Sequence, residues 1–152
     1  MKPETIVLLA AGLFAAAAIA VAAVRRKLRW SLKAAERKSG EEFEKFVARV
    51  FVANGYKCEF TKASGDQGID LLVRKRLTKI GIQVKKYSHP VGNAAVQEAV
   101  AGKKFYKTDK VAVVTNNRFT RSAIALAEAN GVELIDRDGL EILIENAKRK
   151  NK

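Results

Sequence analysis

Hydrophobic and polar positions divide the chain into an apolar N-terminal stretch and a longer region in which helix and strand patterns alternate. Residues 6–24 carry no charged and no strongly polar side chain. As a helix this stretch would span about 28 Å, close to the roughly 30 Å of hydrocarbon in a bilayer. The pattern predicts an N-terminal transmembrane anchor over residues 1–24. A cleaved signal peptide and a buried helix are the alternatives.

A basic cluster follows the apolar stretch. Trp30 comes where an interfacial aromatic residue would lie, and before it stand Arg25, Arg26, Lys27 and Arg29. An excess of Lys and Arg marks the cytoplasmic side of a membrane span. We therefore expect a basic juxtamembrane helix or linker over residues 25–38, lying on anionic headgroups. The expected location is the cell inner membrane, with a single span and the remaining chain in the cytoplasm.

From Ser39 onward the pattern predicts one domain, residues 39–152. Ser39 and Glu42 form a capping-box pattern at the start of a helix that ends at Gly55. Alternating or continuous apolar runs predict strands, and helical spacing predicts three further helices. The strands are expected at 56–61, 69–75, 79–87, 110–116 and 132–136, and the helices at 93–106, 121–130 and 139–149. A run of three strands followed by helical crossovers favours an α/β fold with a mixed β-sheet flanked by helices.

Composition and charge narrow the class of partner. The 152 residues include 29 Lys and Arg against 16 Asp and Glu, which gives a net charge of +13. Such an excess indicates a polyanion, either nucleic acid or an anionic membrane surface, and a solvated basic face without a partner is the alternative. The one cysteine, Cys58, fits a reducing compartment. With one histidine and no Cys/His cluster, a zinc site is not expected.

Polar residues interrupt two of the predicted strands. Strand alternation puts Gln83 and Lys85 on one face, and Asp70 converges with them if the two strands pair. A carboxylate and an amide oxygen are hard ligands suited to Mg²⁺. A neighbouring ammonium can orient an attacking water and stabilise developing negative charge, as phosphodiester hydrolysis requires. A buried Asp–Lys pair with Gln as a spacer is the structural alternative.

Three motifs occur in a fixed order, "GEEFEKFVA", "GDQGID" and "QVK", and a predicted helix follows them. With the later "VVTNNRFTRSAIALAEANGVELIDRDGL", they make residues 39–145 resemble the Mrr-like restriction endonuclease family of the PD-(D/E)xK nuclease superfamily. The resemblance implies a restriction endonuclease-like fold, preceded here by the N-terminal transmembrane helix. It also implies a DNA endonuclease activity.

The resemblance also implies roles for individual residues. Asp70 matches the metal-binding aspartate, Gln83 stands where most of the superfamily has a second acidic ligand, and Lys85 matches the catalytic lysine. Glu44 matches a helical glutamate that supports the metal site or the attacking water. Val84 is grouped with Asp70 and Gln83 as metal-binding. The expected cofactor is Mg²⁺, with Mn²⁺ as the alternative.

Further polar residues near the predicted site are candidates for contacts with the DNA backbone. They are Arg74, Lys75, Lys86, Gln97, Lys103 and Lys104. A solvated face is again the alternative. The predicted partners are therefore DNA, a lipid membrane contacted through the N-terminal helix, and a second copy of the chain, because double-strand cleavage needs two active sites.

The sequence thus predicts a membrane-anchored, metal-dependent DNA endonuclease that acts in restriction of foreign or modified DNA or in DNA repair. A non-catalytic module that tethers DNA to the membrane is the alternative, but it leaves the coincidence of Asp70, Gln83 and Lys85 unexplained. An RNA-directed nuclease is a third possibility. We expect no separate recognition domain of the kind that multidomain restriction enzymes carry, so a sequence or methylation specificity does not follow from the resemblance.

Overall fold

One sheet organises the structure, a computed structural model that describes residues 13–23, 30–61 and 67–150. Its five strands lie in the order β1-β2-β3-β4-β5. They are β1 Lys57–Phe60, β2 Leu71–Lys75, β3 Thr78–Lys85, β4 Lys110–Thr115 and β5 Val132–Ile135. The pairs β1–β2 and β2–β3 are antiparallel, whereas β3–β4 and β4–β5 are parallel. The predicted mixed sheet is confirmed.

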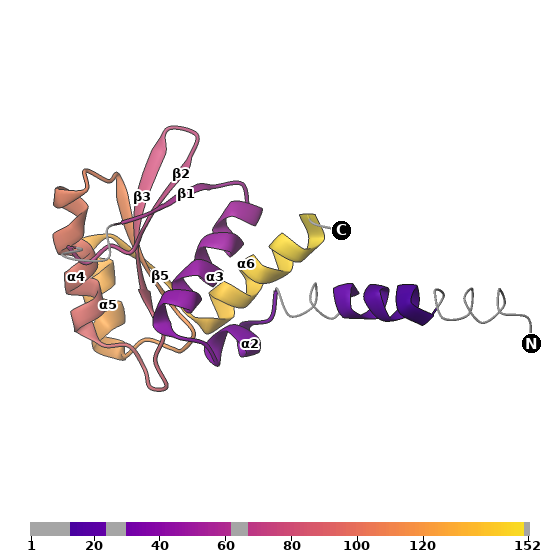
Figure 1. Ribbon diagram of the computed structural model, residues 1–152. Helices are drawn as coiled ribbons and strands as arrows, with labels where there is room; N and C mark the ends of the chain where they lie inside the picture. The colour runs from indigo at the N-terminus through magenta and orange to yellow at the C-terminus, as the bar shows by residue number, and fades with distance from the viewer. Residues whose placement is uncertain (1–12, 24–29, 62–66, 151–152) are drawn as a thin grey trace, which may run out of the picture.

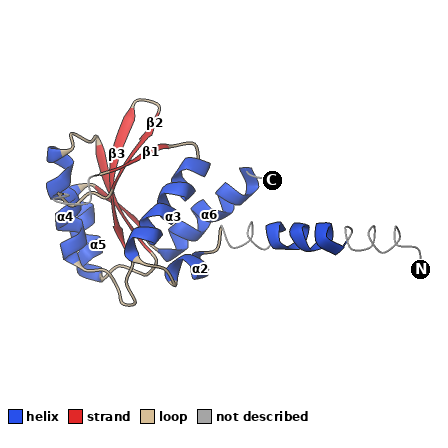
Figure 2. Cartoon of the chain, viewed as in Figure 1, coloured by secondary structure: helices blue, strands red, loops and turns tan. Residues whose placement is uncertain are grey.

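Helices cover both faces of this sheet, so the fold has three layers (Figures 1 and 2). The helices are α2 Leu32–Glu36, α3 Gly40–Ala53, α4 Asn93–Phe105, α5 Arg121–Asn130 and α6 Arg137–Lys150. One core lies under α3 and α6 and takes Ile82 and Val84 from β3. The other lies under α4 and α5 and takes Val111 and Val113 from β4. The apolar strand residues therefore divide between two cores, as strand alternation requires.

Local capping chemistry sets the ends of the helices. The Ser39 hydroxyl accepts a hydrogen bond from the Glu42 amide at 3.2 Å, which confirms the predicted N-cap of α3. Helix α6 begins two residues earlier than predicted because Asp136 caps it. The Gly139 amide donates to Asp136 Oδ1 at 3.0 Å, and the Leu140 amide donates to the Asp136 carbonyl at 2.8 Å.

The folded domain begins before the predicted boundary at residue 39. Trp30, Leu32 and Ala35 are at most 6% exposed and belong to the core under α3 and α6. Ser31 caps α2 by accepting from the Ala34 amide at 3.2 Å. Residues 30–38, the described part of the predicted juxtamembrane segment, therefore contain the short helix α2 and pack on the domain. Residues 25–29 lie outside the described part of the chain.

The predicted anchor, residues 1–24, falls largely outside the described residues. Its described part, residues 13–23, is helical and its side chains are exposed. In the ranges that the structure describes, no helix combines the length and the apolar character needed to cross a membrane.

Candidate active site

The pairing of β2 with β3 brings Asp70 to Gln83. Leu71 pairs with Ile82, so the next step along the ladder places Asp70 opposite Gln83. The Asp70 amide donates to the Ile82 carbonyl at 2.9 Å, which continues the ladder one residue beyond β2. Asp70 Oδ2 then accepts from the Val84 amide at 2.6 Å. The carboxylate is thus fixed across the end of the hairpin, next to the main chain of β3.

Gln83 occupies a buried position on the neighbouring strand. Its side chain is 5% exposed, and within the described residues its Oε1 atom is buried with no hydrogen-bond partner. Leaving a buried acceptor unpaired costs about 1–3 kcal/mol, and native proteins rarely accept this cost without a reason. An oxygen that accepts no hydrogen bond beside a carboxylate suits a hard divalent cation.

Lys85 ends β3 on the same face of the strand as Gln83. Its Nζ lies 2.6 Å from Glu98 Oε2 of α4, and its side chain is 18% exposed. Burial acts to lower the pKa of Lys85, but the hydrogen bond and charge of Glu98, with smaller effects of Tyr87 and Asp70, raise it above its ordinary value. The ammonium is therefore kept protonated at the edge of the site.

Glu98 is the residue that the sequence analysis missed. The sequence pattern predicts its neighbour Gln97 as a candidate DNA contact. In the structure Gln97 is exposed, whereas Glu98 pairs with Lys85. Two glycines bring the loop before β2 into contact with α4. A Cβ on Gly68, whose φ is +76°, would lie 2.4 Å from the Glu98 carbonyl oxygen, and a Cβ on Gly102 would lie 2.4 Å from Ile69 Cγ1. This close approach places Glu98 over the end of β3.

The donor set for a metal is small. Within the described residues, no group of three or more His, Cys, Asp or Glu side chains is placed to hold a metal ion. The oxygens available are instead the Asp70 carboxylate and the unpaired Gln83 Oε1, which fit Mg²⁺ better than a softer metal. Val84 gives its amide to Asp70 and its side chain to the core, so any metal contact would come from its carbonyl oxygen.

Glu44 comes from a different layer of the fold. It lies half-buried on α3, the helix that covers the Ile82 and Val84 face of the sheet. Gln83 and Lys85 lie on the other face, toward α4. The support of the metal site by Glu44 stays a prediction.

Two of the basic candidates for DNA contact are engaged elsewhere. Lys86 Nζ donates to the Glu36 carbonyl at 3.3 Å and also to the Lys38 carbonyl, so it holds the C-terminal end of α2. Lys75 Nζ lies 4.7 Å from the centre of the Tyr56 ring and 3.4 Å from the Asn54 carbonyl, at the end of α3. Both ammonium groups are thus bound to the protein on the α2 and α3 side.

The remaining candidates lie on α4 and on the α4 side of β2. Gln97, Lys103 and Lys104 are on α4, the helix that carries Glu98; Gln97 and Lys104 are exposed and Lys103 is half-buried. Arg74 is exposed on β2 and alternates with Val73, which belongs to the opposite core. Arg74 pairs with Lys79, near the turn between β2 and β3 and away from Lys85. The contact of these four residues with DNA stays a prediction.

Comparisons with known proteins identify the family and the fold of the chain. The Mrr catalytic-domain family (Mrr_cat), described as a restriction endonuclease, matches residues 35–144. Among solved structures, the protein of unknown function AF1548 superposes with a TM-score of 0.60 at 19% identity, over 70% of this chain and 65% of its own. The DNA modification-dependent restriction endonuclease AspBHI gives 0.58 at 18% identity, over 71% of this chain and 31% of its own.

A third similar structure is MspJI restriction endonuclease in complex with a 27-mer oligonucleotide, with a TM-score of 0.52 and 20% identity over 72% of this chain and 29% of its own. The chain therefore spans about two thirds of the first of these proteins and about a third of the two named endonucleases. At these identities the likeness establishes a shared fold.

No curated protein matches the sequence. Because the family match covers most of the sequence and includes every residue of the candidate site, the chain belongs to the Mrr catalytic-domain family of restriction endonucleases.

Proposed function

We propose that this chain is a metal-dependent DNA endonuclease whose active site is formed by Asp70, Gln83 and Lys85. The observation that carries the proposal is the buried, unpaired Oε1 of Gln83, on the strand to which the Asp70 carboxylate is hydrogen-bonded. If Gln83 had only a structural role, its buried unpaired oxygen would lower the free energy of unfolding and contribute nothing to the fold. Membership of a restriction endonuclease family supports the same assignment.

The side chains divide the work as follows. Mg²⁺, when bound, would neutralise charge on the scissile phosphate and make a bound water more acidic. Asp70 and Gln83 would hold it through oxygen atoms, with Mn²⁺ as a substitute. Lys85 presents a protonated ammonium that can contact the phosphate oxygens, and Glu98 keeps it in place.

The N-terminal stretch supports a membrane-bound form of this enzyme. The apolar run of residues 6–24 and the basic cluster that follows it favour a single span of the inner membrane with the endonuclease domain in the cytoplasm. Such an anchor would concentrate chains in two dimensions and so favour the paired sites that double-strand cleavage needs. Foreign or modified DNA, or DNA under repair, is the proposed substrate.

A plasmid assay tests the proposal. Full-length protein in detergent is incubated with supercoiled plasmid, methylated and unmethylated, with and without Mg²⁺. Asp70→Asn and Lys85→Ala are compared with two controls of matched chemistry, Asp138→Asn and Lys110→Ala, which are exposed.

Metal-dependent nicking or linearisation that both site variants lose and both controls keep is the expected result. A linear product would favour paired active sites. Salt-sensitive binding without cleavage on either plasmid, unchanged by Asp70→Asn and Lys85→Ala, would replace the proposal with the DNA tether.

A further inference from the structure

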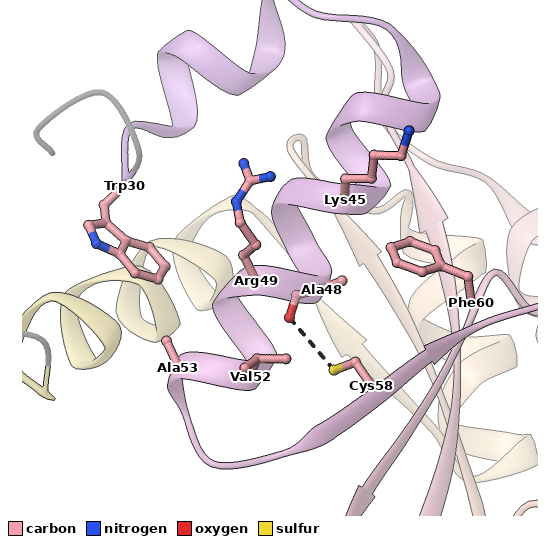
Figure 3. Close-up of a pocket in the computed structure, with 8 residues that line it drawn as sticks. All are labelled: Trp30, Lys45, Ala48, Arg49, Val52, Ala53, Cys58 and Phe60. Atoms are coloured by element: carbon pink, nitrogen blue, oxygen red, sulfur yellow. Dashed lines mark hydrogen bonds between the residues drawn. The ribbon is translucent and has the colours of Figure 1, made fainter. Parts of the chain in front are cut away.

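An apolar groove lies on the α3 side of the sheet, away from the candidate active site. It has a volume of about 420 Å³ and is formed by Trp30, the outer side of α3 and strand β1 (Figure 3). Val52 of α3 is 55% exposed and Phe60 of β1 is 53% exposed. Two large apolar side chains are therefore presented to the surroundings around a hollow, next to the edge strand of the sheet.

Positive side chains accompany this apolar surface. Lys45 and Arg49 of α3 also line the groove, and in Figure 3 Arg49 extends between Trp30 and Lys45. Lys45 is paired with Glu41 at 2.5 Å, so one of these charges is partly balanced. Lys150, in the basic last turn of α6, has its Nζ 3.5 Å from the carbonyl of Asn54, the residue after α3. Apolar side chains bordered by cationic ones match the chemistry of an anionic lipid surface.

The length of chain before the groove limits where this surface can lie. The predicted membrane-spanning stretch ends at residue 24, and Trp30 is 6% exposed in the core. Six residue steps can reach about 20 Å even when fully extended. If residues 6–24 cross the bilayer, the rim of the groove at Trp30 is held within that distance of its surface.

The candidate active site faces the other way. Lys85 and Glu98 meet under α4, whereas the groove lies on α3, and the sheet separates these two helices (Figure 1). A domain that rests on a membrane through the groove therefore leaves the α4 side open to DNA.

We infer that the groove surface formed by Trp30, Val52 and Phe60, with Arg49 beside it, is the face by which the domain rests on an anionic bilayer. The inference builds on the proposed anchor and adds to it an orientation of the whole domain. Val52 and Phe60 insert at the level of the headgroups, and Arg49 contacts lipid phosphates. A second copy of the chain is the competing occupant.

The test uses two exposed phenylalanines on opposite sides of the sheet. Full-length protein in the Cys58→Ser background carries one new cysteine for a fluorophore, at Phe60→Cys or at Phe105→Cys on α4, where Phe105 is 64% exposed. Each is reconstituted into phosphatidylglycerol-containing vesicles with or without spin-labelled lipid. We expect loss of fluorescence at position 60 and none at position 105. We also expect Arg49→Glu to reduce the quenching at position 60, whereas Arg121→Glu, an exposed change on α5, leaves it unaltered.

Other outcomes overturn the inference in distinguishable ways. Flotation with vesicles but equal quenching at both positions, or quenching at position 105 alone, would reject the orientation and keep the anchor. Failure to float would reject the anchor as well. Ready disulfide cross-linking of unlabelled Phe60→Cys, with no lipid quenching, would assign the groove to a second copy. Plasmid cleavage by the same proteins reports on the nuclease proposal separately.

Discussion

Lys85 and Glu98 form an ion pair of 2.6 Å that joins the end of β3 to α4. The two residues come from separate elements, and the pair links the strand that carries Gln83 to helix α4. Glu98 contributes a second effect, because its charge and hydrogen bond outweigh the burial that would otherwise lower the Lys85 pKa. The acid thus both holds the ammonium in place and keeps it charged.

Glu98→Gln should slow plasmid cleavage by about tenfold, because a charge-assisted bond that positions Lys85 is replaced by a weaker neutral one. Glu98→Asp, with a shorter reach, should recover only part of the rate, and Glu128→Gln, the same change at an exposed position of α5, should leave the rate unchanged. The rate of single-turnover cleavage at saturating DNA measures the cleavage step directly. Equal rates for Glu98→Gln and wild type would show that the pair is not used in catalysis.

The same pair predicts how stability depends on pH. Because the folded-state pKa of Lys85 is raised, its contribution is fully present below the ordinary lysine value and is lost as the pH rises through the folded value. Glu98→Gln should therefore unfold at lower urea concentration than the wild type near neutral pH, and the difference should narrow above about pH 10.5, the ordinary lysine value. Urea titrations at several pH values give the comparison, and a difference that widens with pH would contradict it.

Replacing Gln83 by an apolar residue should raise the stability of the fold and abolish cleavage. Gln83→Leu removes a buried unpaired oxygen at similar side-chain size, so we expect a gain of about 1–2 kcal/mol in the free energy of unfolding. Cleavage should fall to background because a metal-binding oxygen is lost. Gln97→Leu, at an exposed position, serves as the control and should change stability by less than about 0.5 kcal/mol. A destabilised Gln83→Leu would point to a hydrogen-bonding role in the protein instead.

Gly68 should not tolerate a side chain. Its φ of +76° disfavours any L residue, and a Cβ would lie 2.4 Å from the Glu98 carbonyl oxygen. We expect Gly68→Ala to cost about 2 kcal/mol or more and to weaken the Lys85–Glu98 contact. Gly40→Ala, on α3 with nothing within 4 Å of the added atom, should be neutral or slightly stabilising. Chemical denaturation gives the free energy of unfolding of both variants. An equal loss of stability in Gly68→Ala and Gly40→Ala would rule out the close contact at Gly68.

Lys86 and Lys104 should behave differently although both were predicted to contact DNA. Lys86 is held by the carbonyls at the end of α2, so Lys86→Ala should cost about 1 kcal/mol of stability and leave the salt dependence of DNA binding unaltered. Lys104 is exposed on α4, so Lys104→Ala should keep stability and lower the slope of log K against log salt by about one. Binding isotherms at several salt concentrations distinguish the two, and a changed slope for Lys86→Ala would restore it to the DNA interface.

Cys58 should react slowly with alkylating reagents. Burial raises its pKa to about 11, so at pH 8 the thiolate is about a hundredfold scarcer than for a thiol at the ordinary value of 9.0. Iodoacetamide should therefore modify urea-denatured protein far faster than native protein. Equal rates would show that the groove opens enough to hydrate the thiol.

Much of the fold followed from alternation and capping in the sequence. Asp70 and Gln83 were expected to meet because two strands joined by a short turn pair as neighbours, and the register confirms it. The N-cap of α3 at Ser39 could be predicted from the sequence because its partner Glu42 lies only three residues away. These features depend on contacts between residues near in the chain, or on a repeat of period two.

The features that the sequence did not reveal depend on packing between distant elements. Glu98, the partner of Lys85, lies where Gly68 and Gly102 let a loop and a helix approach closely, and no periodicity signals that approach. Trp30 was read as an interfacial residue beside a basic cluster, since α2 has only five residues and shows no helical repeat. The sequence does not distinguish Lys86 from the other surface cations, because its partner, the Glu36 carbonyl, lies 50 residues earlier in the chain.

The bond between Lys86 and the end of α2 also has a mechanical consequence. Lys86 directly follows Lys85, and its ammonium binds the Glu36 carbonyl. Glu36 in turn pairs with Arg137 of α6, which donates to the Asn116 carbonyl just beyond β4. The end of α2 is thus hydrogen-bonded to the residue that directly follows Lys85 and, through Arg137, linked to the residue just beyond β4. A displacement of α2 would therefore be transmitted to the ends of two neighbouring strands, one of which carries Lys85.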